Sequence, residues 1–220
     1  MPDAPAKGRR GAYQRPRESE APDPEILVAR AAQLLSARSN VDMLQQEIAD
    51  YVIPRKAVIV EQRAEGEELT EHVWDSTAIR ANELLAARIQ GALTSPSIRW
   101  FSLKTRNEQV NKLYSVRTWL NAVEEQLYLA LRQSNFNAEI GEVYIDLGAF
   151  GIGALLIESI ERDGTYGFMF HAIAPGRYCI AENHEGEVDT VIRWLSMTTR
   201  QCAQQFGKDA LPESWGKELD

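Results

Sequence analysis

The stretch SNFNAEIGEVYIDLGAFGIGALLIE, residues 134–158, decides the fold that the sequence predicts. Its first half predicts a short amphipathic helix, because Ile140, Val143 and Leu147 recur on one helical face. Gly148 is expected to supply the left-handed residue that ends this helix. The remainder of the stretch is expected to turn back against the helix and to enter a strand.

The glycines of this stretch predict a structural hinge rather than a phosphate site. The hinge consists of Gly148, Gly151 and Gly153, which allow the chain to reverse closely against the preceding helix. A dinucleotide-binding fingerprint needs a strand, then glycines, then a helix whose N-terminus meets the phosphates. Here the order is reversed, since the apolar run 154–157 predicts a buried strand after the glycines.

Composition excludes several classes of protein. The 220 residues are 44% hydrophobic and contain no apolar run long enough to span a bilayer. The N-terminus has no apolar core, so no secretory signal is expected. The two cysteines, Cys179 and Cys202, have no paired spacing, which argues against a disulfide framework and indicates a reducing compartment.

Charge divides the chain into a basic tail and an acidic body. The net charge is −8, yet the first twenty residues carry five Lys and Arg against three acidic residues. An acidic body does not hold nucleic acid over its whole surface by releasing counterions. The basic tail is expected either to be solvated or to contact a partner.

The pattern along the chain predicts an α+β protein in which long amphipathic helices precede antiparallel β-hairpins. We expect a disordered tail (1–22), a mainly helical part (23–150), a β-hairpin part with a short closing helix (151–207) and a truncated end (208–220). The expected helices are 23–53, broken near 39–40, then 75–93, 110–133 and 199–206. The expected strands are 58–63, 99–103, 155–162, 166–173, 178–182 and 188–195.

The helix at 110–133 carries the clearest apolar stripe of the sequence. Its members repeat at alternating spacings of three and four, which is the pattern of a packed helix face. They are Leu113, Val116, Leu120, Val123, Leu127 and Leu131, and Trp119 and Tyr128 widen the stripe. Periodicity leaves two interpretations open, a core of the chain itself or contact with a neighbouring subunit.

No catalytic, cofactor or metal site is expected from the residues. His184-Glu185 begins like a zinc-protease motif, but its second histidine is absent. Asp146 and Glu158 flank the hinge and would be the candidates for paired carboxylates, although solvated or capping roles are favoured. The alternating aromatic residues of strand 166–173 resemble a base-stacking platform, but core packing is favoured because no basic residues lie between them.

Four blocks of sequence, taken in order, resemble one known family. The blocks are Glu47–Arg55, then Trp74–Ala78 with Leu84–Ala86, Gln90–Pro96 and Arg99–Phe101, then Ser134–Phe136 with Asp146–Gly151, and finally Ile180–Asn183 with Gly186–Val191. Together they resemble the head-to-tail connecting proteins, which are the portal proteins of short-tailed, T7-like bacteriophages. The resemblance covers residues 30 to 210, and members of that family are much longer.

The resemblance implies a structural protein of the virion rather than an enzyme. It implies a homo-oligomer, a dodecameric ring at one capsid vertex, through which double-stranded DNA passes without sequence-specific binding during packaging and ejection. It implies terminase, scaffold, capsid and tail adaptor proteins as partners, no cofactor, no membrane, and the host cytoplasm as the place of assembly. The chain is then expected to be the N-terminal, wing-like portion, with the stem, clip and crown encoded beyond Asp220.

Two other functions remain as alternatives at this point. A stand-alone interaction or adaptor module would bind its partner through the basic tail, so that removing residues 1–22 abolishes binding. A nucleic-acid-processing enzyme would use Gly151, Gly153 and the nearby carboxylates, and would bind nucleotide or metal in calorimetry.

Overall fold

The structure is a computed structural model that describes residues 23–61, 66–162, 165–207, 211–212 and 215. Within these ranges the helices are α1 (Pro24–Ala37), α2 (Ser39–Val52), η2 (Pro54–Lys56, a 3-10 turn), α3 (Thr77–Leu93), α4 (Glu108–Asn111), α5 (Tyr114–Gln133), α6 (Phe136–Phe150) and α7 (Thr199–Phe206). The strands are β1 (Ala154–Arg162), β2 (Thr165–Ile173), β3 (Tyr178–Glu182) and β4 (Val188–Arg193). This arrangement confirms the predicted α+β class; the predicted tail, residues 1–22, lies outside the described residues.

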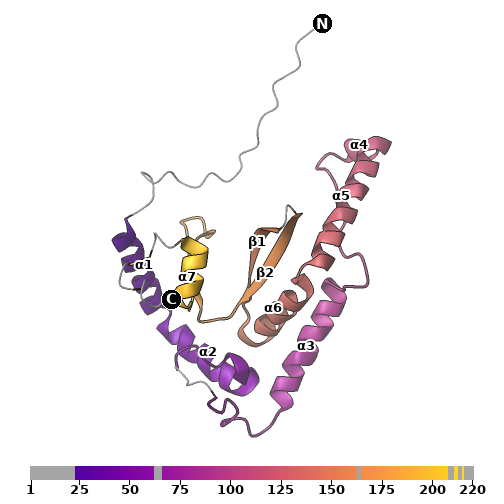
Figure 1. Cartoon of the computed structure of the whole chain (residues 1–220). Helices are drawn as coiled ribbons and strands as arrows, with labels where there is room; N and C mark the ends of the chain where they lie inside the picture. The colour runs from indigo at the N-terminus through magenta and orange to yellow at the C-terminus, as the bar shows by residue number, and fades with distance from the viewer. Residues whose placement is uncertain (1–22, 62–65, 163–164, 208–210, 213–214, 216–220) are drawn as a thin grey trace.

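Figure 1 shows how the helices surround the first hairpin. Helices α3 and α6 run side by side, and the β1–β2 hairpin lies between them and the α1–α2 pair. Helix α5 extends away from this body, with α4 at its far end. The strands form two separate two-stranded sheets, β1–β2 and β3–β4.

The N-terminal helices begin and break where the sequence predicts. Asp23 caps α1, because its Oδ1 accepts a hydrogen bond of 3.0 Å from the amide of Glu25. The predicted break falls at Arg38, which separates α1 from α2. Pro54 lacks an amide proton and ends α2 by starting the 3-10 turn η2.

The predicted strand 58–63 is wrong over its described part, residues 58–61, which form no strand and bend at 59–61. A side chain of α2 takes the place of a partner strand. The Oε1 of Gln46 accepts from the amides of Ile59 and Val60 at 2.9 and 3.0 Å, and its Nε2 donates to the carbonyl of Ala57 at 3.1 Å. The polar backbone groups are therefore satisfied without a sheet.

The predicted strand 99–103 is also wrong, for a similar reason. The hydroxyl of Tyr128 in α5 accepts from the amide of Phe101 at 2.7 Å and donates to its carbonyl at 2.9 Å. Glu124 Oε2 accepts from the amide of Leu103 at 3.2 Å. The segment is thus extended but pairs with helix side chains instead of a strand.

The predicted helix 110–133 is divided into two. The short helix α4 ends at Asn111, and Leu113 has the extended backbone (φ −66°, ψ 127°) that precedes α5. The stripe residue Leu113 therefore lies just outside the helix.

Both predicted hairpins form. Strands β1 and β2 pair antiparallel from Ala154 opposite Ile173 to Arg162 opposite Thr165, while the predicted Asp163-Gly164 turn lies outside the described residues. Strands β3 and β4 pair around a turn that contains Gly186 at φ 79°, with an irregularity between Ala181 and Glu182.

Helix α6 fixes the outer edge of β2 with two side chains. Asn135, its cap residue, accepts from the amide of Phe170 at 2.9 Å and donates to the carbonyl of the same residue at 2.7 Å. Glu139 accepts from the amide of Ala172 at 2.7 Å. These bonds attach the first hairpin to the helical part of the chain.

Gly148 does not end α6, contrary to prediction. The helix continues to Phe150, and the left-handed residue is Gly151 at φ 72°. Gly148 instead lies at the crossing with α3, where an added Cβ would stand 2.3 Å from Asn82 Oδ1. Gly153 follows the turn, and a Cβ there would stand 2.8 Å from Val143 Cγ1. Two of the three hinge glycines are thus positions of close approach.

Replacing Gly148 with alanine is expected to lower the free energy of unfolding by about 1–3 kcal/mol, because the overpacked α3–α6 crossing outweighs the better helix propensity. Gly91 in α3 is the matched control, since nothing lies within 4 Å of its added Cβ. Gly91→Ala should raise the free energy of unfolding by about 0.5–1 kcal/mol. Chemical denaturation measures both, and an equal gain from the two substitutions would contradict the close crossing.

Candidate subunit interface

Helix α5 carries the apolar stripe that the sequence singles out, and the chain covers it only in part. Leu113 is 55% exposed, and the other five members of the stripe are half-buried. Beside the stripe, Trp119 is 63% exposed. A helix face with this many incompletely covered apolar side chains is typical of a surface that contacts another protein.

The buried residues of α5 are Glu124 and Tyr128, which lie to one side of the stripe. They hold the extended segment that contains Phe101 and Leu103, so this segment covers one side of the helix. The aromatic rings of Phe101 and Tyr128 stack at a centroid distance of 4.3 Å. Sequence periodicity could not find this contact, because a glutamate and a tyrosyl hydroxyl give no apolar signal.

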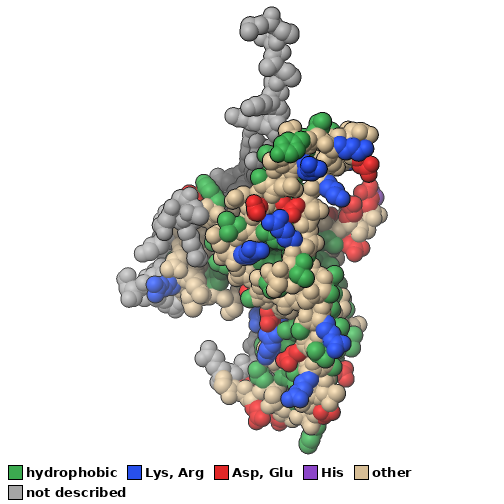
Figure 2. All heavy atoms as spheres, turned by 90° about the vertical axis from the view of Figure 1, so that its right-hand side faces the viewer, with side chains coloured by type: hydrophobic (Ala, Val, Ile, Leu, Met, Phe, Trp, Pro, Cys, Tyr) green, Lys and Arg blue, Asp and Glu red, His purple; other side chains and the backbone are tan. Residues whose placement is uncertain are grey.

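The side of the molecule that carries α3 and α5 is mixed in character. Figure 2 shows hydrophobic side chains along its whole height, interrupted by both basic and acidic groups. No single sign of charge dominates this face, so its character is that of a protein contact surface rather than of an electrostatic binding surface for nucleic acid.

A partly buried ion cluster joins η2 to α6. The Nζ of Lys56 lies 2.5 Å from Asp146 Oδ1 and 3.1 Å from Glu142 Oε2, and Arg55 lies 2.8 Å from the same Glu142 oxygen. Asp146 is 0% exposed, and its Oδ2 is buried without a hydrogen-bond partner. The expectation of a solvated or capping role for Asp146 is therefore wrong.

Burial and hydrogen bonding act in opposite directions on these carboxyls. Burial raises the pKa of Asp146 above its ordinary value, and the Lys56 hydrogen bond only partly opposes this. Burial would also raise the pKa of Glu142, but hydrogen bonds from Arg55 and Lys56 outweigh it and hold that pKa below its ordinary value. The cluster is a structural link in which two basic side chains of η2 face two acidic side chains of α6.

The two candidate paired carboxylates lie in different environments. Glu158 is half-exposed on β1, with His171 at 3.4 Å and Arg193 at 3.8 Å, whereas Asp146 binds Lys56. The structure therefore does not bring them together as an acid–base pair.

The described residues offer no group of three or more His, Cys, Asp and Glu side chains that could hold a metal ion. His184 is exposed, with an 88% accessible side chain. In the part of the chain that the structure describes, no helix is both long enough and apolar enough to cross a bilayer.

The aromatic residues of β2 divide along the strand. Phe170 is buried and packs edge-on against Phe136 at 5.1 Å, whereas Phe168 is 36% exposed and Tyr166 is 76% exposed. Only one of the three thus belongs to the core.

Comparison with known proteins identifies the class. The model of the family described as bacteriophage head to tail connecting protein matches residues 25–220, and the chain belongs to this family. It is 30% identical over 192 residues to the probable portal protein of Bordetella phage BPP-1 and 28% identical over 191 residues to the portal protein of Salmonella phage epsilon15. These matches cover 87% and 86% of this chain but 34% of each relative, so the chain spans about a third of their length.

Proposed function

We propose that the chain forms part of the wall of a portal ring at the capsid vertex, in which copies of the chain contact one another through α5. The two relatives carry the name portal protein, and family membership makes a component of the phage head–tail connection the natural setting. The observation that supports the α5 contact is its stripe of half-covered apolar residues, with Leu113 and Trp119 more than half exposed.

The setting of this family, rather than the α5 stripe alone, favours a ring over a two-fold dimer. The stripe lies along one elongated helix that extends from the body. Contacts in which one surface meets a different surface of the next copy close into a ring when the rotation allows it. The same ring would leave a central passage for double-stranded DNA during packaging and ejection, with terminase, scaffold, capsid and tail proteins as its partners.

The charge of the chain is compatible with passage of DNA. Beyond its first twenty residues the chain carries 19 basic against 29 acidic residues. An acidic wall repels phosphates, and weak contacts allow the duplex to slide. On this proposal the chain acts structurally, without a catalytic step of its own.

Replacing Trp119 with glutamate is expected to abolish assembly, because the substitution removes an exposed aromatic side chain and places a charge beside the apolar stripe. Light scattering behind size exclusion, with negative-stain images of the peak, gives the mass and the shape of the assembly. The free energy of unfolding should change by less than about 0.5 kcal/mol, since Trp119 is exposed in the single chain.

Leu129 provides the control on the same helix, since it is 47% exposed and lies on the side of α5 that faces away from the apolar stripe. Leu129→Glu should leave the ring intact. A wild-type chain that remains monomeric at every concentration, or a ring that tolerates Trp119→Glu as well as Leu129→Glu, would contradict the proposed contact.

A further inference from the structure

The α5 face alone is too small for a stable contact between copies. A helix of twenty residues is about 30 Å long and about 10 Å wide, so one face offers about 300 Å². Specific interfaces bury about 800 Å² on each partner. A second contact between copies is therefore needed, and two features of this chain complement each other in the required way.

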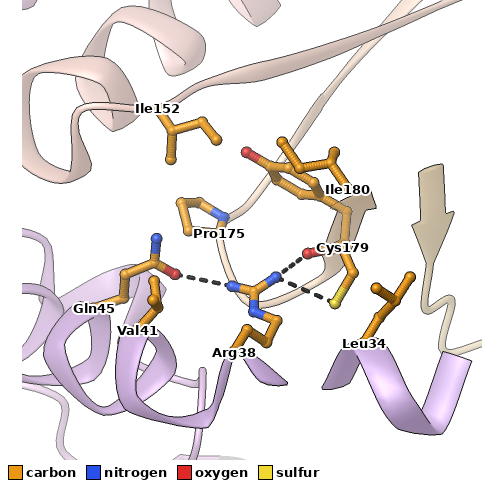
Figure 3. Close-up of a pocket in the computed structure, with 9 residues that line it drawn as sticks. Leu34, Arg38, Val41, Gln45, Ile152, Pro175, Cys179 and Ile180 are labelled. Carbon is orange, nitrogen blue, oxygen red and sulfur yellow. Dashed lines mark hydrogen bonds between the residues drawn. The ribbon is translucent and has the colours of Figure 1, made fainter. Parts of the chain in front are cut away.

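The first feature is a pocket between the α1–α2 junction and β3. Its volume is about 170 Å³, and its walls are the apolar side chains Leu34, Val41, Ile152, Pro175 and Ile180 together with Arg38, Gln45, Tyr178 and Cys179. Figure 3 shows Arg38 on the floor of this pocket, with Ile152 and Ile180 on the opposite side. An apolar cavity of about 150 Å³ admits a benzene ring, so this pocket admits the six-membered ring of an aromatic side chain.

The pocket contains one polar group without a partner. Tyr178 is 5% exposed, and its hydroxyl is buried without a hydrogen bond. Burial raises the pKa of Tyr178, so the hydroxyl stays protonated and neutral. A buried polar atom in this state is stabilised by an occupant that supplies a hydrogen bond.

Arg38 is held in place at the pocket. It donates hydrogen bonds to the carbonyl of Tyr178, to Cys179 Sγ at 3.7 Å and to Gln45 Oε1 at 3.1 Å, and it pairs with Asp42 at 2.6 Å. A fixed guanidinium is a good surface for the face of an aromatic ring.

The second feature is Trp74, whose side chain is 95% exposed in the loop before α3. Trp74 is the most exposed large hydrophobic residue of the described chain. The adjacent Asp75 orders this loop, because its Oδ1 accepts from the amide and the hydroxyl of Thr77 at 3.0 and 2.9 Å. The backbone next to Trp74 is therefore held by hydrogen bonds within the loop, while the indole itself is exposed.

The two features match in hydrogen bonding. An indole has one donor and no acceptor, which suits the unpaired hydroxyl oxygen of Tyr178. Figure 1 places the loop before α3 at the lower end of the molecule, away from the α1–α2 junction.

We infer that Trp74 of one copy inserts into the Tyr178 pocket of the next copy. The contact joins two different surfaces, so it repeats in one direction around an assembly. It adds a buried aromatic anchor of about 150–250 Å² to the α5 face, so that the two contacts together cover more than half of the area of a specific interface. The inference rests on the proposed function in one respect, namely that copies of this chain associate.

A double-mutant cycle on self-association tests the hydrogen bond. Trp74→Phe removes the indole donor, and Tyr178→Phe removes only a hydroxyl that has no partner in the single chain, so both variants keep the fold. Each single variant should raise the dissociation constant of self-association roughly tenfold, as measured by analytical ultracentrifugation. The double variant should be no weaker than either single one. Trp215→Phe, at a residue 43% exposed, is the control and should not change association.

Photo-cross-linking locates the contact even when association is weak. In one chain, p-benzoylphenylalanine replaces Trp74, and this chain is mixed with an isotopically labelled copy that lacks the group. After irradiation, mass spectrometry identifies the cross-linked residues and shows whether they belong to the labelled copy. We expect cross-links between copies at Leu34, Val41 or Ile180. The same group placed at Ile98, which is 68% exposed, should give none there.

The outcomes separate this inference from the proposed function. Cross-links within one copy, or at other surfaces, overturn the insertion of Trp74. A double variant whose loss of affinity equals the product of the two single losses overturns it too. Rings that form normally with Trp74→Phe and Trp74→Ala overturn it as well and leave the portal proposal standing. Cross-links in the pocket within open chains instead of rings support the insertion and overturn the ring.

Discussion

Replacing Lys56 with methionine is expected to lower the free energy of unfolding by about 3–5 kcal/mol. The Lys56 ammonium lies 2.5 Å from Asp146, which is 0% exposed and has one oxygen already without a partner. Methionine keeps most of the side-chain volume but leaves the buried carboxylate without its counter-ion. Chemical denaturation followed by circular dichroism measures the loss.

Two controls separate the charge from the packing. Arg55 pairs with Glu142 at the surface, so Arg55→Met should cost less than about 1 kcal/mol. Lys56→Met combined with Asp146→Leu should recover most of the lost stability, because an apolar pair replaces the ion pair. A double variant as unstable as Lys56→Met alone would show that packing, not charge, is responsible.

The loss caused by Lys56→Met should also depend on pH. Burial already raises the pKa of Asp146, and removal of the ammonium raises it further. A carboxyl whose pKa is higher in the folded than in the unfolded state contributes most to stability below its ordinary pKa. That contribution is lost as the pH rises through the folded value. The variant should therefore be closer to wild type in acid than at neutral pH.

Replacing Phe136 with alanine is expected to cost about 3–5 kcal/mol, because the substitution opens a cavity where three parts of the chain meet. Phe136 is 8% exposed; it stacks on Trp100 at 6.0 Å and meets Phe170 edge-on at 5.1 Å. It therefore joins α6, the extended segment before α4, and β2. Thermal and chemical denaturation both report this loss.

Tyr166 is the control for Phe136, since it is also aromatic but lies 76% exposed on β2. Tyr166→Ala should change the free energy of unfolding by less than about 0.5 kcal/mol. Similar losses at the two positions would mean that the aromatic cluster around Phe136 does not form the core of the chain.

Local signals predicted the helices and hairpins well. Asp23, Pro54 and Thr198 mark helix ends through capping chemistry or the missing amide of proline, which depends on neighbouring residues alone. The hairpins follow from apolar runs separated by turn residues. The class of the fold was therefore available from the sequence.

The features that were not predicted from the sequence depend on contacts between residues far apart in the chain. The segments expected as strands at 58–63 and 99–103 have their backbone groups taken by Gln46 and Tyr128, and no propensity encodes such bonds. Asp146 became a buried ion through Lys56, which lies ninety residues earlier in the chain. The pocket for Trp74 likewise combines side chains from α1, α2 and β3.

Helix α6 also fixes the register of the first hairpin, because its side chains bind particular backbone groups of β2. Asn135 and Glu139 are four positions apart, which is about 6 Å along a helix, and they bind Phe170 and Ala172, two positions and about 6.8 Å apart along a strand. A slip of β2 by one residue would point these backbone groups toward β1 and turn Phe170 away from Phe136. Insertions and deletions in β2 are therefore disfavoured, whatever the sequence of the hairpin tip.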